Sequence, residues 1–93
     1  MQVHEFIMLA RIDGETLEAW VAAGWITPQR SGEGADYSEV DLARAHLIAD
    51  LHHLGVNHEG IPIILDLIDQ VHGLRRVARG LLSQVKEGRK EGR

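Results

Sequence analysis

Hydrophobic residues recur at helical spacing in several parts of the chain, and the most regular repeat lies near the C-terminus. It consists of apolar residues three and four positions apart, namely Ile64, Leu67, Val71, Leu74, Ala78, Leu81 and Val85. This is the a/d pattern of about three heptads, which is typical of a helix that packs against another helix along a narrow seam. We therefore predict a long helix and a homodimer interface. The residues predicted at that interface are Ile64, Leu67, Val71, Leu74 and Leu81.

Two glycines, Gly73 and Gly80, lie inside this predicted helix and weaken it. Each costs about 1 kcal/mol relative to alanine in a helix interior. Packing must therefore supply stability, either against the rest of the chain or in an antiparallel pair with a second copy. At the end of the chain, the repeat KEGRKEGR has no apolar residue, so we predict a disordered basic tail over residues 87–93.

Nearer the N-terminus, the pattern predicts a helix that begins after Asp13. This residue is suited to cap a helix whose buried face contains Leu17, Trp20 and Val21. Gly24 is suited to end the helix, because glycine readily adopts the left-handed conformation common at that position. The apolar stretch FIML, residues 6–9, fits either a strand or a helical turn.

A polar loop and another helix follow. The loop, residues 25–37 (WITPQRSGEGADY), contains proline and glycines and predicts a small β-wing. Ser38 and Asp41 resemble a capping box at the start of the next helix, which Gly55 ends. The apolar face of this helix is predicted to contain Val40, Ala43, Leu47, Leu51 and Leu54.

Charge is distributed unevenly along the chain, whose formal net charge is -4. Residues 1–70 contain 3 Lys and Arg against 12 Asp and Glu, whereas residues 71–93 contain 7 against 2. An acidic body repels phosphate and attracts cations, which favours a basic partner. Alternatively, these charges lie on solvated helix faces and only keep a small protein soluble.

Several classes of function are not expected. The chain has no cysteine, which excludes disulfides and thiolate chemistry. No signal peptide or membrane-spanning apolar run is found, so we expect a cytoplasmic protein without membrane contact. The serines Ser31, Ser38 and Ser83 have no predictable catalytic partner, and we therefore expect no enzymatic activity and no cofactor.

A metal site is a lesser alternative. His46, Asp50 and His53 lie on one side of a predicted helix. A single helical stripe rarely supplies three ligands to one tetrahedral ion, and no residue can be named that would hold these side chains in place by hydrogen bonds. We therefore expect no bound metal.

The N-terminal half resembles the winged helix-turn-helix of the MerR type. The similarity spans residues 5–56 and rests on Asp13, Thr16 and Leu17, followed by Trp20, Gly24, Ile26, Pro28, Arg30 and Tyr37. In DNA-binding members of that family, the helix carries an arginine and aromatic residues after the TL pair, where this chain has Glu18 and Ala19. The surface that would read DNA contains five acids against two arginines: Asp13, Glu15, Glu18, Glu33 and Asp36 against Arg11 and Arg30. Because affinity for DNA depends on neutralising phosphates, we do not expect this surface to bind DNA.

A closer resemblance is to the chaperone-modulator family, the CbpM-like proteins. It covers residues 5–85 and is carried by GETLEAWVAAGWITPQ, by residues 37–48 and by LHHLGVNHEGIPIILDLIDQVHGL with the heptads after it. The resemblance implies a non-enzymatic inhibitor that binds the J-domain of a DnaJ/CbpA-like co-chaperone and restrains its activity with DnaK. It also implies a mainly α fold, with a MerR-like winged domain over residues 1–56 and a helical dimerisation segment over residues 57–86.

Acidic residues beside apolar ones suggest where such a partner docks. The predicted docking residues are Asp50, Glu59, Asp66 and Asp69. Asp66 and Asp69 can equally serve only to solubilise the outside of a dimer helix. The alternative function is a MerR-like transcriptional regulator that contacts DNA through its basic C-terminal segment. The residues of that segment are Arg75, Arg76, Arg79, Lys86, Arg89, Lys90 and Arg93.

Overall fold

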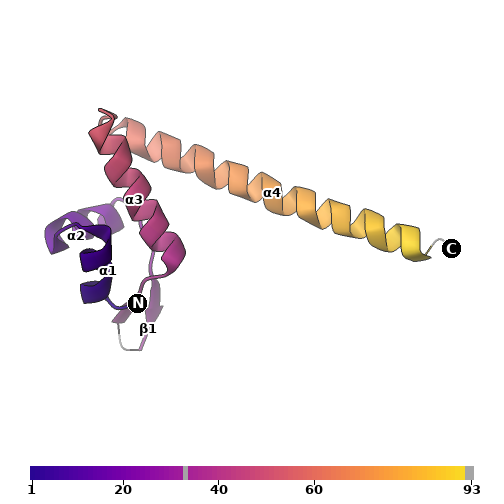
Figure 1. Ribbon diagram of the computed structural model, residues 1–93, viewed down its shortest axis with the longest axis horizontal. Helices are drawn as coiled ribbons and strands as arrows, with labels where there is room; N and C mark the ends of the chain where they lie inside the picture. Colours follow the sequence, from indigo (N-terminus) through magenta and orange to yellow (C-terminus); the bar gives the residue numbers. More distant parts are fainter. Residues whose placement is uncertain (33, 92–93) are drawn as a thin grey trace. The chain divides into compact units, whose positions relative to one another are not determined.

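The protein is mainly α-helical with one small β-hairpin, as the sequence predicts (Figure 1). The structure, a computed structural model, describes residues 1–32 and 34–91, with side chains described as far as residue 85. Its elements are α1 (Val3–Ala10), α2 (Gly14–Ala22), β1 (Gln29–Ser31), β2 (Gly34–Asp36), α3 (Glu39–His53) and α4 (Gly60–Glu91). The chain divides into two compact units, Met1–Ile61 and Pro62–Arg93, which are described separately below.

The first two helices form the helix-turn-helix. The ambiguous FIML stretch belongs to α1, which buries Phe6 and Ala10 and ends at Arg11 in the left-handed conformation (φ 59°). Asp13 caps α2 as predicted, because its Oδ1 accepts a hydrogen bond of 2.7 Å from the Thr16 N–H. Gly24 follows α2 with φ 80°, which confirms its place just after the helix end.

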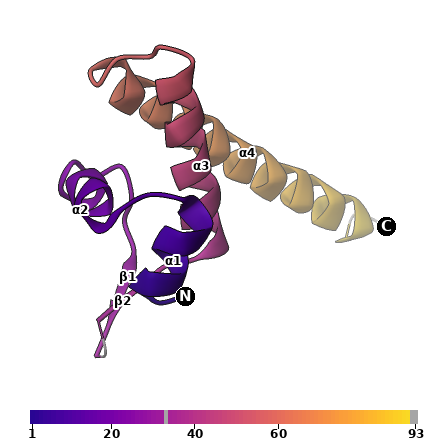
Figure 2. The ribbon, with the colours of Figure 1, turned by 60° about the vertical axis from the view of Figure 1, so that its left-hand side comes forward.

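The predicted wing is present as a two-stranded antiparallel hairpin. Its register pairs Gln29 with Asp36, Arg30 with Ala35 and Ser31 with Gly34. Except for the half-buried Ala35, the described residues of both strands are exposed. Figure 2 shows the hairpin extending away from the three helices of its unit. The wing therefore contributes mainly exposed surface and little to the hydrophobic core.

Helix α3 begins as predicted, but its buried face differs from the prediction. The capping box is complete: Asp41 N–H donates to Ser38 Oγ at 3.1 Å, and Ser38 N–H donates to Asp41 Oδ2 at 2.9 Å. The buried residues are Ala45, Ile48 and Leu51.

Of the five apolar positions predicted for the α3 core face, only Leu51 is buried. Val40 in the first turn is 76% exposed, and Leu54, the C-cap residue, is 80% exposed. Both lie at an end of the helix, where fewer neighbours surround a side chain. The buried face of α3 instead contains Ala45 and Ile48, both fully buried, and this helix packs against α1.

Aromatic residues complete the core of the Met1–Ile61 unit. The rings of Phe6 and Tyr37 stack with centroids 4.4 Å apart, so α1 is joined to the segment that follows the wing. Trp20 is buried, as the sequence analysis expects. Trp25 is buried as well, and the two rings lie 6.5 Å apart. Burial of aromatic rings is a large source of stability in so small a unit.

The second unit consists of α4 beyond its first two residues. Asn57 Oδ1 accepts a hydrogen bond of 2.8 Å from Gly60 N–H, and Pro62 lies in the first turn, where a missing N–H is tolerated. The helix runs through Glu91. This helix includes residues 87–91, for which the sequence predicts disorder. Gly92 and Arg93 lie outside the described residues.

Candidate functional site

The exposed face of α2 carries acidic residues and alanines. Glu15, Glu18, Ala19 and Ala22 are exposed on this helix, whereas Leu17 and Trp20 are buried. The sequence of α2, GETLEAWVA, contains no lysine or arginine. In the helix that would enter a DNA groove, no side chain is therefore available to neutralise a phosphate.

The N-terminus of α2 is also occupied by an acid. Hydrogen bonds from the Thr16 side chain and backbone lower the pKa of Asp13 below its ordinary value. Its carboxylate is therefore ionised at neutral pH. It accepts a hydrogen bond from the Thr16 N–H, which has no acceptor within the helix. The N-terminus of a helix is otherwise a favourable place for a phosphate, and a phosphate at this one would meet the negative charge of Asp13.

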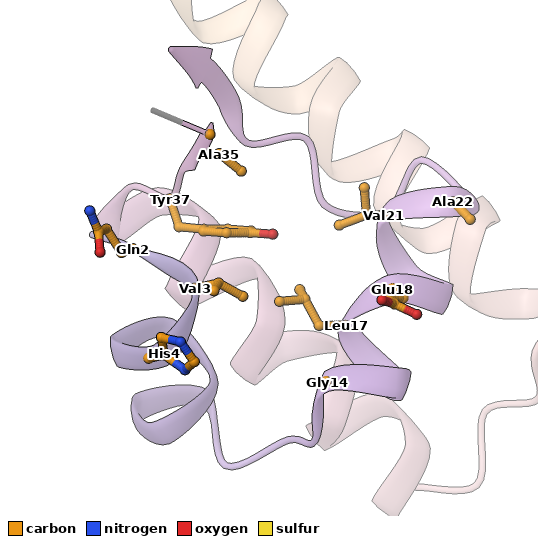
Figure 3. A pocket seen from close by; sticks show the side chains of 11 residues that line it. Gln2, Val3, His4, Gly14, Leu17, Glu18, Val21, Ala22, Ala35 and Tyr37 are labelled. Atoms are coloured by element: carbon orange, nitrogen blue, oxygen red, sulfur yellow. The ribbon is translucent and has the colours of Figure 1, made fainter. Parts of the chain in front are cut away.

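A groove lies beside this acidic face, within the Met1–Ile61 unit. Its volume is about 640 Å³, and it is bounded by the start of α1, by α2 and by the end of the wing. Figure 3 shows the side chains of Val3, Leu17, Val21 and Tyr37 converging on the same space. Glu18 lines the groove on the α2 side. The site is thus an apolar groove with a carboxylate at its edge.

Tyr37 contributes a polar group to the groove. Its ring is only 5% exposed, and its hydroxyl end is directed toward Leu17 and Val21 (Figure 3). Burial raises the pKa of Tyr37 above its ordinary value; the nearby Arg30 lowers it and Asp41 raises it. The hydroxyl is therefore neutral at physiological pH and is able both to donate and to accept a hydrogen bond.

Sequence reasoning missed this groove. Val3 and Ala35 lie in segments whose apolar residues follow no clear periodicity, and Ala22 is a small residue on an exposed face. One signal was present: Glu18 and Ala22 are four residues apart on α2, so an acid and a small residue adjoin on one face.

The four docking residues predicted from sequence are exposed and occur in both units. Asp50 on α3 and Glu59 before α4 belong to Met1–Ile61. Asp66 and Asp69 lie one helical turn apart on α4, in the unit Pro62–Arg93. The carboxylate of Asp66 accepts a hydrogen bond of 3.0 Å from Gln70 Nε2. The role of these four acids in docking stays a prediction.

Along α4, the predicted dimer seam is an apolar stripe. Leu67 is 54% exposed, Val71 47%, Leu74 69% and Leu81 57%, while Ile64 is half-buried. A shallow groove of about 330 Å³ follows Ile64, Leu67, Ile68, Val71, His72 and Arg75. Exposed apolar side chains in a row of this length are typical of a surface that a partner covers.

The histidines make contacts that do not resemble a metal centre. His46 Nε2 is 3.1 Å from the Leu9 carbonyl oxygen, and His53 Nδ1 is 2.8 Å from that of Ala49. The His58 ring lies 5.2 Å from the Trp25 ring and 5.6 Å from that of His52. Across residues 1–32 and 34–91, no group of three His, Cys, Asp or Glu residues is arranged to hold a metal ion.

None of the helices described here is long and apolar enough to cross a membrane.

Comparison with known proteins places the chain in a family. Residues 1–82 match the family described as MerR HTH family regulatory protein. No curated protein and no solved structure matches the chain. The helix-turn-helix of α1 and α2 with its β-hairpin wing agrees with the family match, which extends through most of α4. The protein therefore belongs to the MerR HTH regulatory family.

Proposed function

We propose that this MerR-family protein is a non-enzymatic modulator that binds the J-domain of a DnaJ/CbpA-like co-chaperone and restrains its activity with DnaK. One observation carries the proposal: α2 has no cation, exposes Glu15 and Glu18, and begins at the ionised Asp13. A J-domain engages DnaK through a basic helix and an adjacent loop. An acidic protein that covers this helix competes directly with DnaK, and charge complementarity speeds their encounter.

A direct titration of the purified J-domain tests this proposal. We expect saturable binding that weakens as salt rises, because the two surfaces carry opposite charge. The double variant Asp66→Lys/Asp69→Lys tests the acids of α4 in the same assay. If they contact the J-domain, affinity falls about tenfold with little change in Tm, since exposed charges contribute little to folding. Light scattering of the same variant shows whether its mass is that of the wild-type protein, which separates a lost J-domain contact from a disturbed pairing of α4. Unchanged affinity of the folded double variant would remove those two acids from the docking surface.

The alternative function, a MerR-like transcriptional regulator, has its own supporting observations. The family contains regulators, and α4 carries Arg75, Arg76 and Arg79 on its exposed surface. A regulator of this type would bind duplex DNA with an affinity that falls steeply between about 50 and 200 mM salt. We expect no DNA binding at the low end of that range. Tight, salt-sensitive binding there would favour the regulator over the J-domain modulator.

We further propose that a second copy of the chain covers the apolar stripe of α4, in antiparallel orientation. Asp66 and Asp69 precede the arginines along the helix, so antiparallel pairing places the acidic half of each helix beside the basic half of the other. Of the antiparallel registers that the heptads allow, we propose the one that pairs all five predicted interface residues. It sets Val71 against the partner's Leu74, Leu67 against the partner's Ala78, and Ile64 against the partner's Leu81.

A further inference from the structure

We infer that the groove between α2 and the wing is the anchor site for the partner. In this inference, the groove holds one bulky apolar side chain of a basic amphipathic helix. Val3, Leu17 and Val21 supply the apolar wall, and the ring of Tyr37 closes one side. The volume of about 640 Å³ lies within the roughly 300–1,000 Å³ of pockets that bind compact ligands, and a leucine or phenylalanine side chain enters it readily. The inference rests on the proposed function only for the identity of the partner.

The charge around the groove selects a basic occupant. Glu18 lines the groove and Glu15 is exposed one turn earlier on α2, while Asp36, beside Tyr37, forms an ion pair of 2.8 Å with the N-terminal ammonium of Met1. The unit Met1–Ile61 as a whole contains ten Asp and Glu residues against three Arg. Phosphate groups and acidic peptides are repelled by such a surface, whereas lysine or arginine residues beside an apolar anchor are attracted to it.

The combination of an apolar wall and adjoining carboxylates suits an amphipathic helix. An amphipathic helix places apolar side chains on one face and cations on its flanks, so one face enters the groove while the flanks meet carboxylates. A buried apolar anchor of this kind supplies most of the affinity in protein interfaces, and the surrounding charges supply selectivity. The neutral hydroxyl of Tyr37 adds a hydrogen-bonding group within the apolar wall.

Two matched pairs of substitutions on α2 test the inference. Ala22 and Ala19 are both exposed alanines of this helix, but only Ala22 lines the groove. Glu18 and Glu15 form the same kind of pair, because Glu18 lines the groove and Glu15 does not. Ala22→Phe narrows the groove and Glu18→Lys reverses its charge, while Ala19→Phe and Glu15→Lys make the same chemical changes outside it. Circular dichroism and Tm show whether each variant folds.

Binding is measured with two probes, a purified J-domain and a synthetic amphipathic helix of leucine and lysine. We expect Ala22→Phe and Glu18→Lys to weaken binding of both probes about tenfold and Ala19→Phe to change it less than about twofold. Glu15→Lys reverses a charge near the groove but outside its lining, so we expect it to weaken binding clearly less than Glu18→Lys does. Equal effects of the groove and control variants, or no effect of either, overturn the inference. If the synthetic helix binds through the groove and the J-domain does not bind, the anchor site stands and the proposed partner is wrong. If neither probe binds the wild-type protein, both proposals fail.

Discussion

At the scale of single residues, hydrogen bonds of the helix caps were the most predictable features of the protein. Asp13 and the Ser38–Asp41 pair perform the capping roles that their sequence positions indicate. Such roles are predictable because a capping bond joins residues two or three positions apart, and therefore depends little on the rest of the fold. The contacts of Tyr37 were not predictable, because Phe6 comes from a distant part of the sequence.

The cap at Asp13 makes stability depend on pH. Its folded-state pKa is lowered, chiefly by the Thr16 side chain, so its contribution is complete above the unfolded-state pKa of about 3.9 and is lost as pH falls through the folded value. We expect Asp13→Ala to lower Tm clearly at pH 7 and much less near pH 2. Thermal melts at both pH values measure this, with Glu15→Ala as a control in the same helical turn. An equal loss of Tm at both pH values would show that the ionised cap has no such role.

At the scale of elements, local signals located the helices better than they located their buried faces. The ends of α2 and α3 follow from caps and from glycines with positive φ, such as Gly24 and Gly55. The buried face of α3 did not follow from residue type, because the packing partner determines which side is covered. Large apolar residues at its ends are exposed, while the small Ala45 is fully buried against the core.

The stripe on α4 gives a prediction at this scale. Leu74→Glu puts a charge at the centre of the proposed antiparallel seam, and burying an unpaired charge opposes association. We expect the wild-type protein to have twice the mass of the 10.4 kDa chain in light scattering at micromolar concentration, and Leu74→Glu to be a monomer.

Ser83→Glu is the matched control for this experiment. Its side chain is exposed on the same helix, at an outer heptad position, so we expect the variant to remain a dimer. A wild-type protein that is monomeric at this concentration would contradict the proposed pairing.

At the scale of the whole molecule, the architecture was predictable and the groove was not. The order of helices, hairpin and long final helix follows from short-range patterns, and the match over residues 1–82 agrees with it. The groove depends on the start of α1, the middle of α2 and the end of the wing being brought together. Such an arrangement is a property of tertiary packing, and no single stretch of sequence contains it.

Under the proposed function, a helix-turn-helix fold is used to bind a protein in place of DNA. The helix at the reading position retains its buried face, with Leu17 and Trp20 in the core, while its outer face carries acids and alanines. The buried residues of α2 therefore maintain the fold, while its exposed residues are available to contact a partner. Under our proposal, this outer face and the adjoining groove recognise a basic protein helix.

The ATPase activity of DnaK, stimulated by the J-domain co-chaperone, tests this central claim most directly. The protein is titrated into the reaction, and the rate of ATP hydrolysis is measured at each concentration. We expect the rate to fall to that of DnaK alone, because the J-domain surface that contacts DnaK becomes covered. We also expect excess J-domain to restore the stimulated rate. A rate that stays at its stimulated value at saturating concentrations of the folded protein would contradict the proposed function.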